Sequence, residues 1–176
     1  MGKSGKAVIC FSHGKESGPW GSKIVALAAV AKNQGFAVES IDYRGISDPD
    51  RRVGKLLAWQ REIIEPVVLV GSSMGAYVAA VAAQEITVKG LFLLAPAISI
   101  PGFGQVQNPQ IRAPEAVIIH GWEDEVIPAP LIIDYARRQN LALHLLPGSH
   151  RLMEVLPQVL DLFTVFLKNC RAELSV

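Results

Sequence analysis

The stretch that decides the fold is VVLVGSSMG, residues 67–75. Its first four residues are apolar and mostly β-branched, which predicts a buried strand, and the alanine-rich residues 74–85 predict a helix. Between them, residues 71–75 have the pattern G-x-S-x-G, in which small flanking residues let a serine project from a sharp turn at a helix N-terminus. The sequence therefore predicts Ser73 as a nucleophile. The alternative is an ordinary turn in which Ser72 or Ser73 only caps the helix.

The rest of the chain repeats this strand–helix alternation. Short apolar runs predict strands over residues 7–12, 36–42, 66–71, 90–94, 115–120 and 141–146. Helical patterns cover residues 18–34, 49–65, 74–85, 129–139 and 152–168, the first closed by Gly35. These elements predict an α/β fold with a doubly wound, mostly parallel six-stranded sheet flanked by helices. With 176 residues and no linker, we expect a single domain over residues 1–176.

A serine nucleophile needs a base within hydrogen-bonding distance, and the sequence offers four histidines. Loops at the carboxyl ends of strands carry the chemistry in a doubly wound sheet. His13 follows the first predicted strand, His120 ends the fifth, and His144 lies within the sixth, where we interpret it as structural. His150 lies in the loop after the sixth strand and gives the chain order serine, acid, histidine. His150 is therefore the predicted general base, the alternative being a packed or solvated histidine.

The acid that orients this base is predicted by exclusion. Residues 97–114, after the fourth strand, contain no Asp or Glu. The next loop, GWEDE at residues 121–125, has three carboxylates, and Asp124 occupies the Gly-x-x-Asp position. A buried carboxylate there would bind Nδ1 of His150 and fix its tautomer. Glu123 and Glu125 remain possible, and Asp124 could instead cap the helix that starts near residue 128.

Nucleophilic attack on an acyl group also needs backbone amides that stabilise an oxyanion. One is expected from Met74, which follows the nucleophile, and the other from the loop after the first strand. Gly14 lets that backbone turn close to the site, so the Lys15 amide is the predicted second donor, with Gly14 or Glu16 as alternatives. The loop lacks the glycine spacing of a P-loop, so no nucleotide site is predicted.

Composition limits the partners of the chain. Half of the residues are hydrophobic, 19% are charged, and the formal net charge is +1. No block of like charges predicts binding to nucleic acid or an anionic membrane, and no apolar run is as long as a membrane span. Cys10 and Cys170 lack metal-ligand or C-x-x-C spacing, so we expect reduced thiols, and no metal or organic cofactor is implied. Residues 1–6 are basic but no signal-peptide core follows, so we expect a cytoplasmic protein.

Taken together, the motifs resemble those of the α/β-hydrolase superfamily along nearly the whole chain. They are FSHG at 11–14, DYRG at 42–45, GSSMG at 71–75, HGWED at 120–124 and GSH at 148–150. The chain is most similar to small members without a cap domain, related to dienelactone hydrolase and to small bacterial esterases. The resemblance implies a minimal sheet that lacks the family's first two strands, with spatial order 4-3-5-6-7-8 in the family's strand numbering. It also implies that Arg44 has a structural role in bracing a neighbouring loop.

Many members of the superfamily carry a helical cap where this chain has only the irregular residues 96–114, so the resemblance implies an open site. Specificity would then rest on a few side chains such as Trp20, Phe103, Trp122 and Leu152, each of which could equally be ordinary packing.

The expected function is a serine hydrolase that cleaves a small carboxylic ester or thioester through an acyl-enzyme. The alternatives are a serine peptidase or amidase and a non-catalytic binding protein of the same fold. The expected partner is a small acyl substrate, and the apolar composition leaves room for a homodimer.

Overall fold

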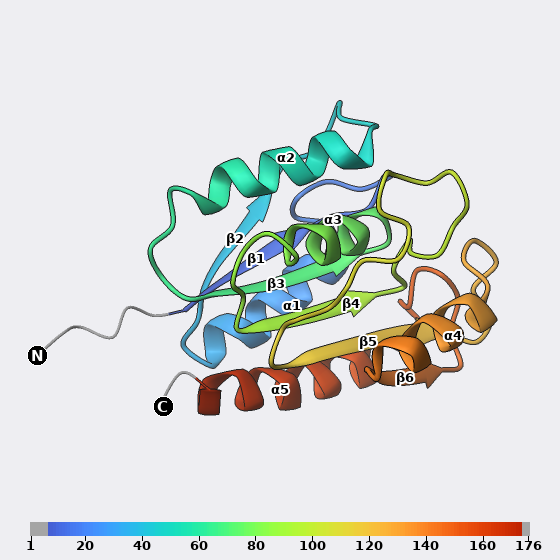
Figure 1. The fold of residues 1–176 in the computed structure, drawn as a ribbon. Coiled ribbons are helices and arrows are strands. Elements are labelled where there is room, and N and C mark those ends of the chain that lie inside the picture. Colours follow the sequence, from blue (N-terminus) through green and yellow to red (C-terminus); the bar gives the residue numbers. More distant parts are fainter. Residues whose placement is uncertain (1–6, 174–176) are drawn as a thin grey trace, which may run out of the picture.

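The computed structural model describes residues 7–173, in which one six-stranded sheet lies between two layers of helices (Figure 1). The strands are β1 (Val8–Ser12), β2 (Ala37–Ile41), β3 (Val67–Ser72), β4 (Gly90–Leu94), β5 (Ala116–Gly121) and β6 (Ala142–Leu146). The helices are α1 (Ser22–Asn33), α2 (Pro49–Gln60), α3 (Met74–Ala82), α4 (Ala129–Gln139) and α5 (Leu156–Glu173). Residues 1–6, the basic start of the chain, lie outside the described residues.

All strand pairings in the sheet are parallel, and the strand order is β2-β1-β3-β4-β5-β6. This confirms the predicted doubly wound sheet and the strand order implied by the family resemblance, with β1 to β6 corresponding to the family's third to eighth strands. The chain winds from β1 outward to β2 and then, on the other side, through β3 to β6. The switch point therefore lies between β1 and β3, where sheets of this kind bind their ligands.

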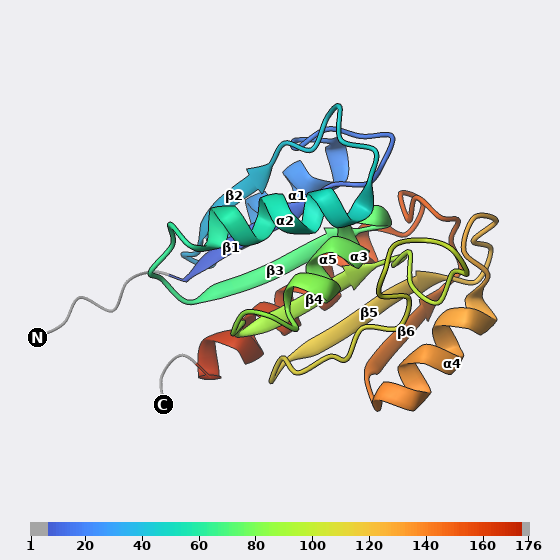
Figure 2. The same ribbon diagram turned by 45° about the horizontal axis from the view of Figure 1, so that its top comes forward.

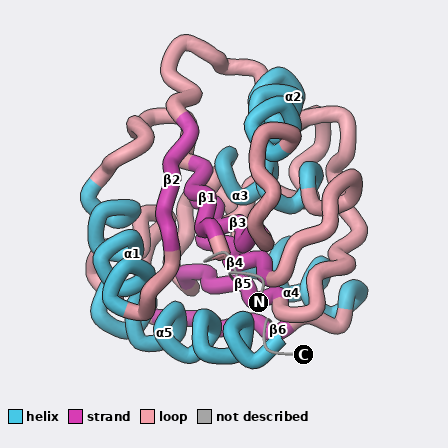
Figure 3. Tube along the Cα trace, turned by 90° about the vertical axis from the view of Figure 1, so that its left-hand side faces the viewer, coloured by secondary structure: helices cyan, strands magenta, loops and turns pink. Residues whose placement is uncertain are grey.

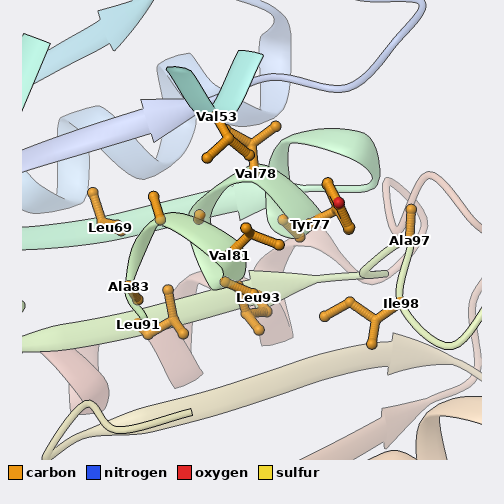
Figure 4. Packing of buried hydrophobic residues seen from close by; sticks show 14 of the residues in the cluster. Val53, Leu69, Tyr77, Val78, Val81, Ala83, Leu91, Leu93, Ala97 and Ile98 are labelled. Atoms are coloured by element: carbon orange, nitrogen blue, oxygen red, sulfur yellow. The ribbon is translucent and has the colours of Figure 1, made fainter. Parts of the chain in front are cut away.

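Helices α2, α3 and α4 cover one face of the sheet, and α1 and α5 cover the other (Figures 2 and 3). Side chains of the central strands alternate between the two faces, as expected for parallel strands that are buried on both sides. Leu91 and Leu93 of β4 face α3, close to Val81 (Figure 4), whereas Phe92 faces α5. Among the described residues, no helix is both long and apolar enough to span a bilayer.

Helix boundaries depart from the prediction mainly in α1, α2 and α5. Helix α1 begins at Ser22 rather than at residue 18, because the loop after β1 continues to that point. Helix α2 ends at Gln60 rather than at residue 65, where Pro66 disfavours helical backbone in the residue before it. Helix α5 begins at Leu156 rather than at residue 152, because Leu152 has a φ of 57°, which is incompatible with a right-handed helix.

Two histidines are fully buried where β1 and β5 end. Nε2 of His13 accepts the Tyr43 N–H at 2.9 Å, so its Nδ1–H donates to the Gly14 carbonyl at 2.7 Å and the ring is neutral. Nε2–H of His120 donates to the Ile127 carbonyl at 2.9 Å, and Nδ1 of His120 has no hydrogen-bond partner within residues 7–173. Burial lowers the pKa of both rings below the ordinary histidine value. The fold therefore holds both histidines in the uncharged form.

The aromatic cluster between β4 and α5 offers a test of the core. The Phe92 ring centroid lies 5.0 Å from that of Phe163 and 5.1 Å from that of Phe166. Replacing Phe163 with Ala should lower the free energy of unfolding by about 3–5 kcal/mol, because it removes a buried ring and leaves a cavity. Val165→Ala, at an exposed position of the same helix, should change it by less than about 0.5 kcal/mol. Urea denaturation followed by circular dichroism measures both, and equal effects would contradict this packing.

Acidification should destabilise the protein through its buried histidines. In the unfolded chain, His13 and His120 bind protons with the ordinary pKa of 6.5, whereas the folded rings bind them only at lower pH. Because the unfolded state then holds more protons, the free energy of unfolding falls as the pH drops through about 6.5. Urea denaturation at pH 7.5 and 5.5 should show this fall, and His120→Gln should reduce it. His144→Gln, at an exposed position of β6, should show the same decrease in the free energy of unfolding as the wild type. An equal decrease in the wild type, His120→Gln and His144→Gln would contradict the conclusion that the buried rings are neutral.

Candidate active site

Ser73 lies in a strained turn between β3 and α3, where the G-x-S-x-G pattern places it. Its backbone angles are φ 55° and ψ −119°, which residues other than glycine rarely adopt. Its N–H donates to the Leu94 carbonyl at 2.9 Å, and its carbonyl accepts the Ala97 N–H at 3.2 Å. The same carbonyl also accepts the N–H groups of Ala76 and Tyr77 in α3. The end of β4 and the start of α3 together hold the strained residue in place.

Two glycines allow this turn to form. A Cβ at Gly71 would overlap the Gly75 carbonyl, and a Cβ at Gly75 would overlap the Ser12 carbonyl at the end of β1. The elbow and the end of β1 therefore pack backbone against backbone. This contact also brings the loop after β1 to the nucleophile, since a Cβ placed on Gly14 would lie 3.6 Å from the Cβ of Ser73.

The loops after β6 and β5 bring His150 and Asp124 to Ser73. Nδ1–H of His150 donates to Oδ2 of Asp124 at 2.8 Å. Nε2 of His150 lies 2.9 Å from Oγ of Ser73 and can accept the hydroxyl proton. The structure thus joins the three side chains singled out in the sequence by two hydrogen bonds, with the imidazole in the tautomer that a general base requires.

The carboxylate of Asp124 is fully buried and accepts several hydrogen bonds. Its Oδ1 accepts the N–H groups of Val126 at 2.9 Å and Ile127 at 2.7 Å, which leaves Oδ2 for the imidazole. Such bonds from backbone N–H groups stabilise the ionised form of a buried carboxylate. Glu123 and Glu125 are exposed. Of the three carboxylates in this loop, the structure brings only Asp124 to the histidine.

Two side chains that were not predicted from the sequence hold the loop that carries the base. Nζ of Lys23, at the start of α1, donates to the Arg151 carbonyl at 2.8 Å. Burial, together with the charge of Arg151, lowers the pKa of Lys23 to about 8. Hydrogen bonds from the Ser149 hydroxyl and from backbone amides lower the pKa of the Glu154 carboxylate. These contacts fix the chain on both sides of the histidine.

The predicted oxyanion donors lie on the two segments that meet at Ser73. Met74 is the first residue of α3, so its N–H has no acceptor within that helix. In the loop after β1, the N–H groups of Gly14 and Lys15 have no acceptor among the described residues. The assignment of Lys15, with Gly14 or Glu16 as alternatives, stays a prediction.

The four side chains considered for specificity lie in different surroundings. Leu152 is fully buried in the core on the face covered by α1 and α5, as expected if its role is ordinary packing. Phe103 packs edge-on against Tyr77, with ring centroids 5.3 Å apart. Trp20 and Trp122 are 49% and 57% exposed, in the loops after β1 and β5. Of these four side chains, only the two tryptophans are therefore largely exposed.

The hydrogen bonds of Arg44 go to its own loop and not to a neighbouring one, so its bracing role stays a prediction. Its guanidinium pairs with the Asp42 carboxylate at 2.6 Å, and both side chains are exposed. Their hydrogen bonds lower the pKa of Asp42. The loop after β1 is bound instead by Arg52 of α2, which donates to two of its carbonyls. Nothing in the local sequence singled out Arg52.

Comparison with known proteins identifies the family. The model of the alpha/beta hydrolase family matches residues 8–168 of the chain. A search of curated proteins finds no match.

Solved structures of similar fold are numerous. A protein from Xanthomonas campestris, presumed to be a hydrolase of the alpha/beta superfamily, is 30% identical with a TM-score of 0.82, over 93% of this chain and 98% of that one. An alpha-beta serine hydrolase homologue from Coxiella burnetii is 24% identical with a TM-score of 0.74, over 92% of this chain and 84% of that one. A serine hydrolase without a lid, also from Xanthomonas campestris, is 20% identical with a TM-score of 0.70, over 92% and 81%. These matches support a hydrolase with a minimal fold and no lid, and the chain belongs to the alpha/beta hydrolase family.

Proposed function

We propose that the protein is a serine hydrolase that cleaves a small carboxylic ester or thioester through an acyl-enzyme intermediate. The observation that carries the proposal is the pair of hydrogen bonds that join Ser73 to His150 at 2.9 Å and His150 to Asp124 at 2.8 Å. A buried carboxylate, a correctly oriented imidazole and a serine in a strained elbow form the arrangement that activates a hydroxyl for acyl transfer. Membership of the alpha/beta hydrolase family supports the same chemistry.

Acylation begins when Oγ of Ser73 attacks the acyl carbon. Nε2 of His150 takes the hydroxyl proton, and the Asp124 carboxylate stabilises the imidazolium that forms. The negative charge moves to the acyl oxygen, where the amides of Met74 and Lys15 bind it. The bond to the leaving alkoxide or thiolate then breaks, and the imidazolium gives this group its proton.

Deacylation repeats these steps with water as the nucleophile. His150 takes a proton from the water as its oxygen attacks the acyl carbon of the Ser73 ester. The tetrahedral intermediate collapses, the carboxylic acid leaves, and the serine hydroxyl recovers its proton from the imidazolium. Each side chain returns to its starting state.

A small substrate fits the surroundings of Ser73. The segment after β4 that takes the place of a cap is irregular and short, and no helix of residues 7–173 lies within it. The two exposed tryptophans at this edge, Trp20 and Trp122, offer apolar surface to an acyl or alcohol group. An open site of this kind encloses little of its substrate, so recognition would rest on a few side chains such as these.

The nucleophile can be tested by replacing Ser73, with replacement of the neighbouring Ser72 as the matched control. Ser73→Ala should reduce turnover of p-nitrophenyl acetate and butyrate by at least about 10³-fold and abolish covalent labelling by a fluorophosphonate probe, because no other group supplies the attacking oxygen. Ser72→Ala, one residue away, should keep both. Mass spectrometry should locate the label on Ser73. A wild-type protein that is folded but unreactive would instead favour a binding role.

The assignment of the triad acid can be tested by replacing each of the three carboxylates in the loop after β5. Asp124→Asn should lower kcat by about 10³- to 10⁴-fold, because an amide at this position favours the wrong tautomer of the imidazole. Glu123→Gln and Glu125→Gln should leave kcat within twofold, since both residues are exposed and the carboxylate bound to His150 is that of Asp124. Steady-state kinetics on p-nitrophenyl acetate measure all three variants. A large loss in either glutamine variant would reassign the acid.

A further inference from the structure

Arg52 is a buried cation without an acidic partner. It lies in the first turn of α2 and is 2% exposed, and no carboxylate of residues 7–173 forms an ion pair with it. Its Nε donates to the Ile46 carbonyl at 2.7 Å, and its guanidinium carbon lies 5.3 Å from the centroid of the Tyr43 ring. Burial lowers its pKa, yet an arginine stays charged inside proteins. Removing such a charge from water is costly, so its hydrogen bonds must offset that cost.

Two of these hydrogen bonds reach the loop that touches Ser73. Nη1 of Arg52 donates to the carbonyls of His13 and Gly14, each at 3.2 Å. Nδ1–H of His13 donates to the same Gly14 carbonyl at 2.7 Å. Gly14 is also the residue whose Cβ position lies 3.6 Å from the Cβ of Ser73. The buried guanidinium and the nucleophile are therefore in contact with one short stretch of backbone.

The direction of the two carbonyls fixes the direction of the next two amides. The described chain contains no cis peptide bond. In a trans peptide, the carbonyl and the N–H that follows it point in opposite directions. Because the carbonyls of His13 and Gly14 point toward Arg52, the N–H groups of Gly14 and Lys15 point away from it. Neither N–H has an acceptor among the described residues, so both can bind a ligand oxygen beside Ser73.

We propose that Arg52 is a positioning residue for the oxyanion hole: it binds the carbonyls behind Gly14 and Lys15 and so orients their amides before substrate arrives. The inference rests on the proposed serine hydrolase function. Amides that are already oriented bind a developing oxyanion without reorganising during the reaction, and this is the source of their catalytic effect. Arg52 touches no reacting atom and acts only through the loop.

Arg52→Met tests the proposal, with Arg51→Met as its matched control. Methionine keeps much of the side-chain volume but donates no hydrogen bond. We expect kcat on p-nitrophenyl acetate to fall by about 10- to 100-fold, somewhat less than the loss of a complete oxyanion donor, with KM within about threefold. Arg51 is exposed and its guanidinium has no hydrogen bond or ion pair among the described residues, so Arg51→Met should leave kcat within twofold.

A transition-state analogue separates oxyanion binding from general damage to the fold. A trifluoromethyl ketone adds to Oγ of Ser73, the serine proton passes to His150, and the ketone oxygen becomes an oxyanion. In Arg52→Met, the affinity for the ketone should fall by the same factor as kcat/KM. If Arg52 had a merely structural role, the two factors would differ. Guanidinium ion at millimolar concentration should restore part of the activity of Arg52→Ala, because it can bind in the space left by the side chain.

The outcomes distinguish this inference from the proposed function. A folded Arg52→Met variant with kcat and ketone affinity within twofold of wild type would overturn the role of Arg52 alone. If that variant does not fold, Arg52→Gln decides: its amide nitrogen reaches the position of Nε, which binds the Ile46 carbonyl, but not that of Nη1, which binds the two loop carbonyls, so unchanged kinetics would also overturn the role. A folded wild-type protein that neither turns over esters nor reacts with the fluorophosphonate would overturn the proposed function itself.

Discussion

The close approach of Gly75 to the Ser12 carbonyl is the contact on which the site depends. The register of the sheet pairs Ser12 with Gly71, so the end of β1 lies beside the last residues of β3, just before the elbow. With no side chain at position 75, the first turn of α3 then rests directly on the backbone of β1. The loop after β1 consequently has to leave the sheet next to Ser73. One steric constraint thus places Ser73 and the backbone of this loop next to each other.

Features that are unfavourable in isolation gather at this edge of the sheet. Ser73, Ala95 and Leu152 all have positive φ, with values of 55°, 41° and 57°. Each costs on the order of 1–3 kcal/mol and persists only where the surroundings determine it fully. The same edge carries buried His13 and the buried charge of Arg52. The two apolar layers on the faces of the sheet supply the stability that tolerates them, which is the pattern expected at a functional site.

Local signals in the sequence account for what could be predicted. The strands follow from apolar runs, and the elbow of Ser73 follows from the glycines on either side of it. His150 was found because its loop follows a strand, and Asp124 because the preceding loop has no carboxylate. Their approach within 3 Å depends on strand order, which came only from the family resemblance.

Contacts between a side chain and a distant backbone could not be predicted. Arg52 binds carbonyls 38 and 39 residues away, and Lys23 binds one that is 128 residues away. A carbonyl group is the same in every residue, so these contacts leave no pattern in the sequence. The start of α5 was predicted too early, at Leu152, for a different reason. Leucine normally favours helix, but here burial of its side chain in the core goes with a left-handed backbone.

Helix α2 explains how a site without a cap can still be rigid. Its first turn carries both Asp50 and Arg52, whose side chains leave the helix in different directions, as residues two apart do. Oδ1 of Asp50 accepts the Tyr77 hydroxyl at 2.6 Å, and Oδ2 accepts the Gln105 N–H at 3.1 Å, which fastens the irregular segment after β4. Ala97, near the start of that segment, donates its N–H to the Ser73 carbonyl.

On the other side of the helix, Arg52 fixes the loop after β1. A single turn of α2 therefore restrains two of the loops that border Ser73. In relatives with a cap, part of this ordering can come from a domain above the site, whereas here it comes from a helix packed against the sheet. The groups around Ser73 are thus held in place by hydrogen bonds from the fold itself.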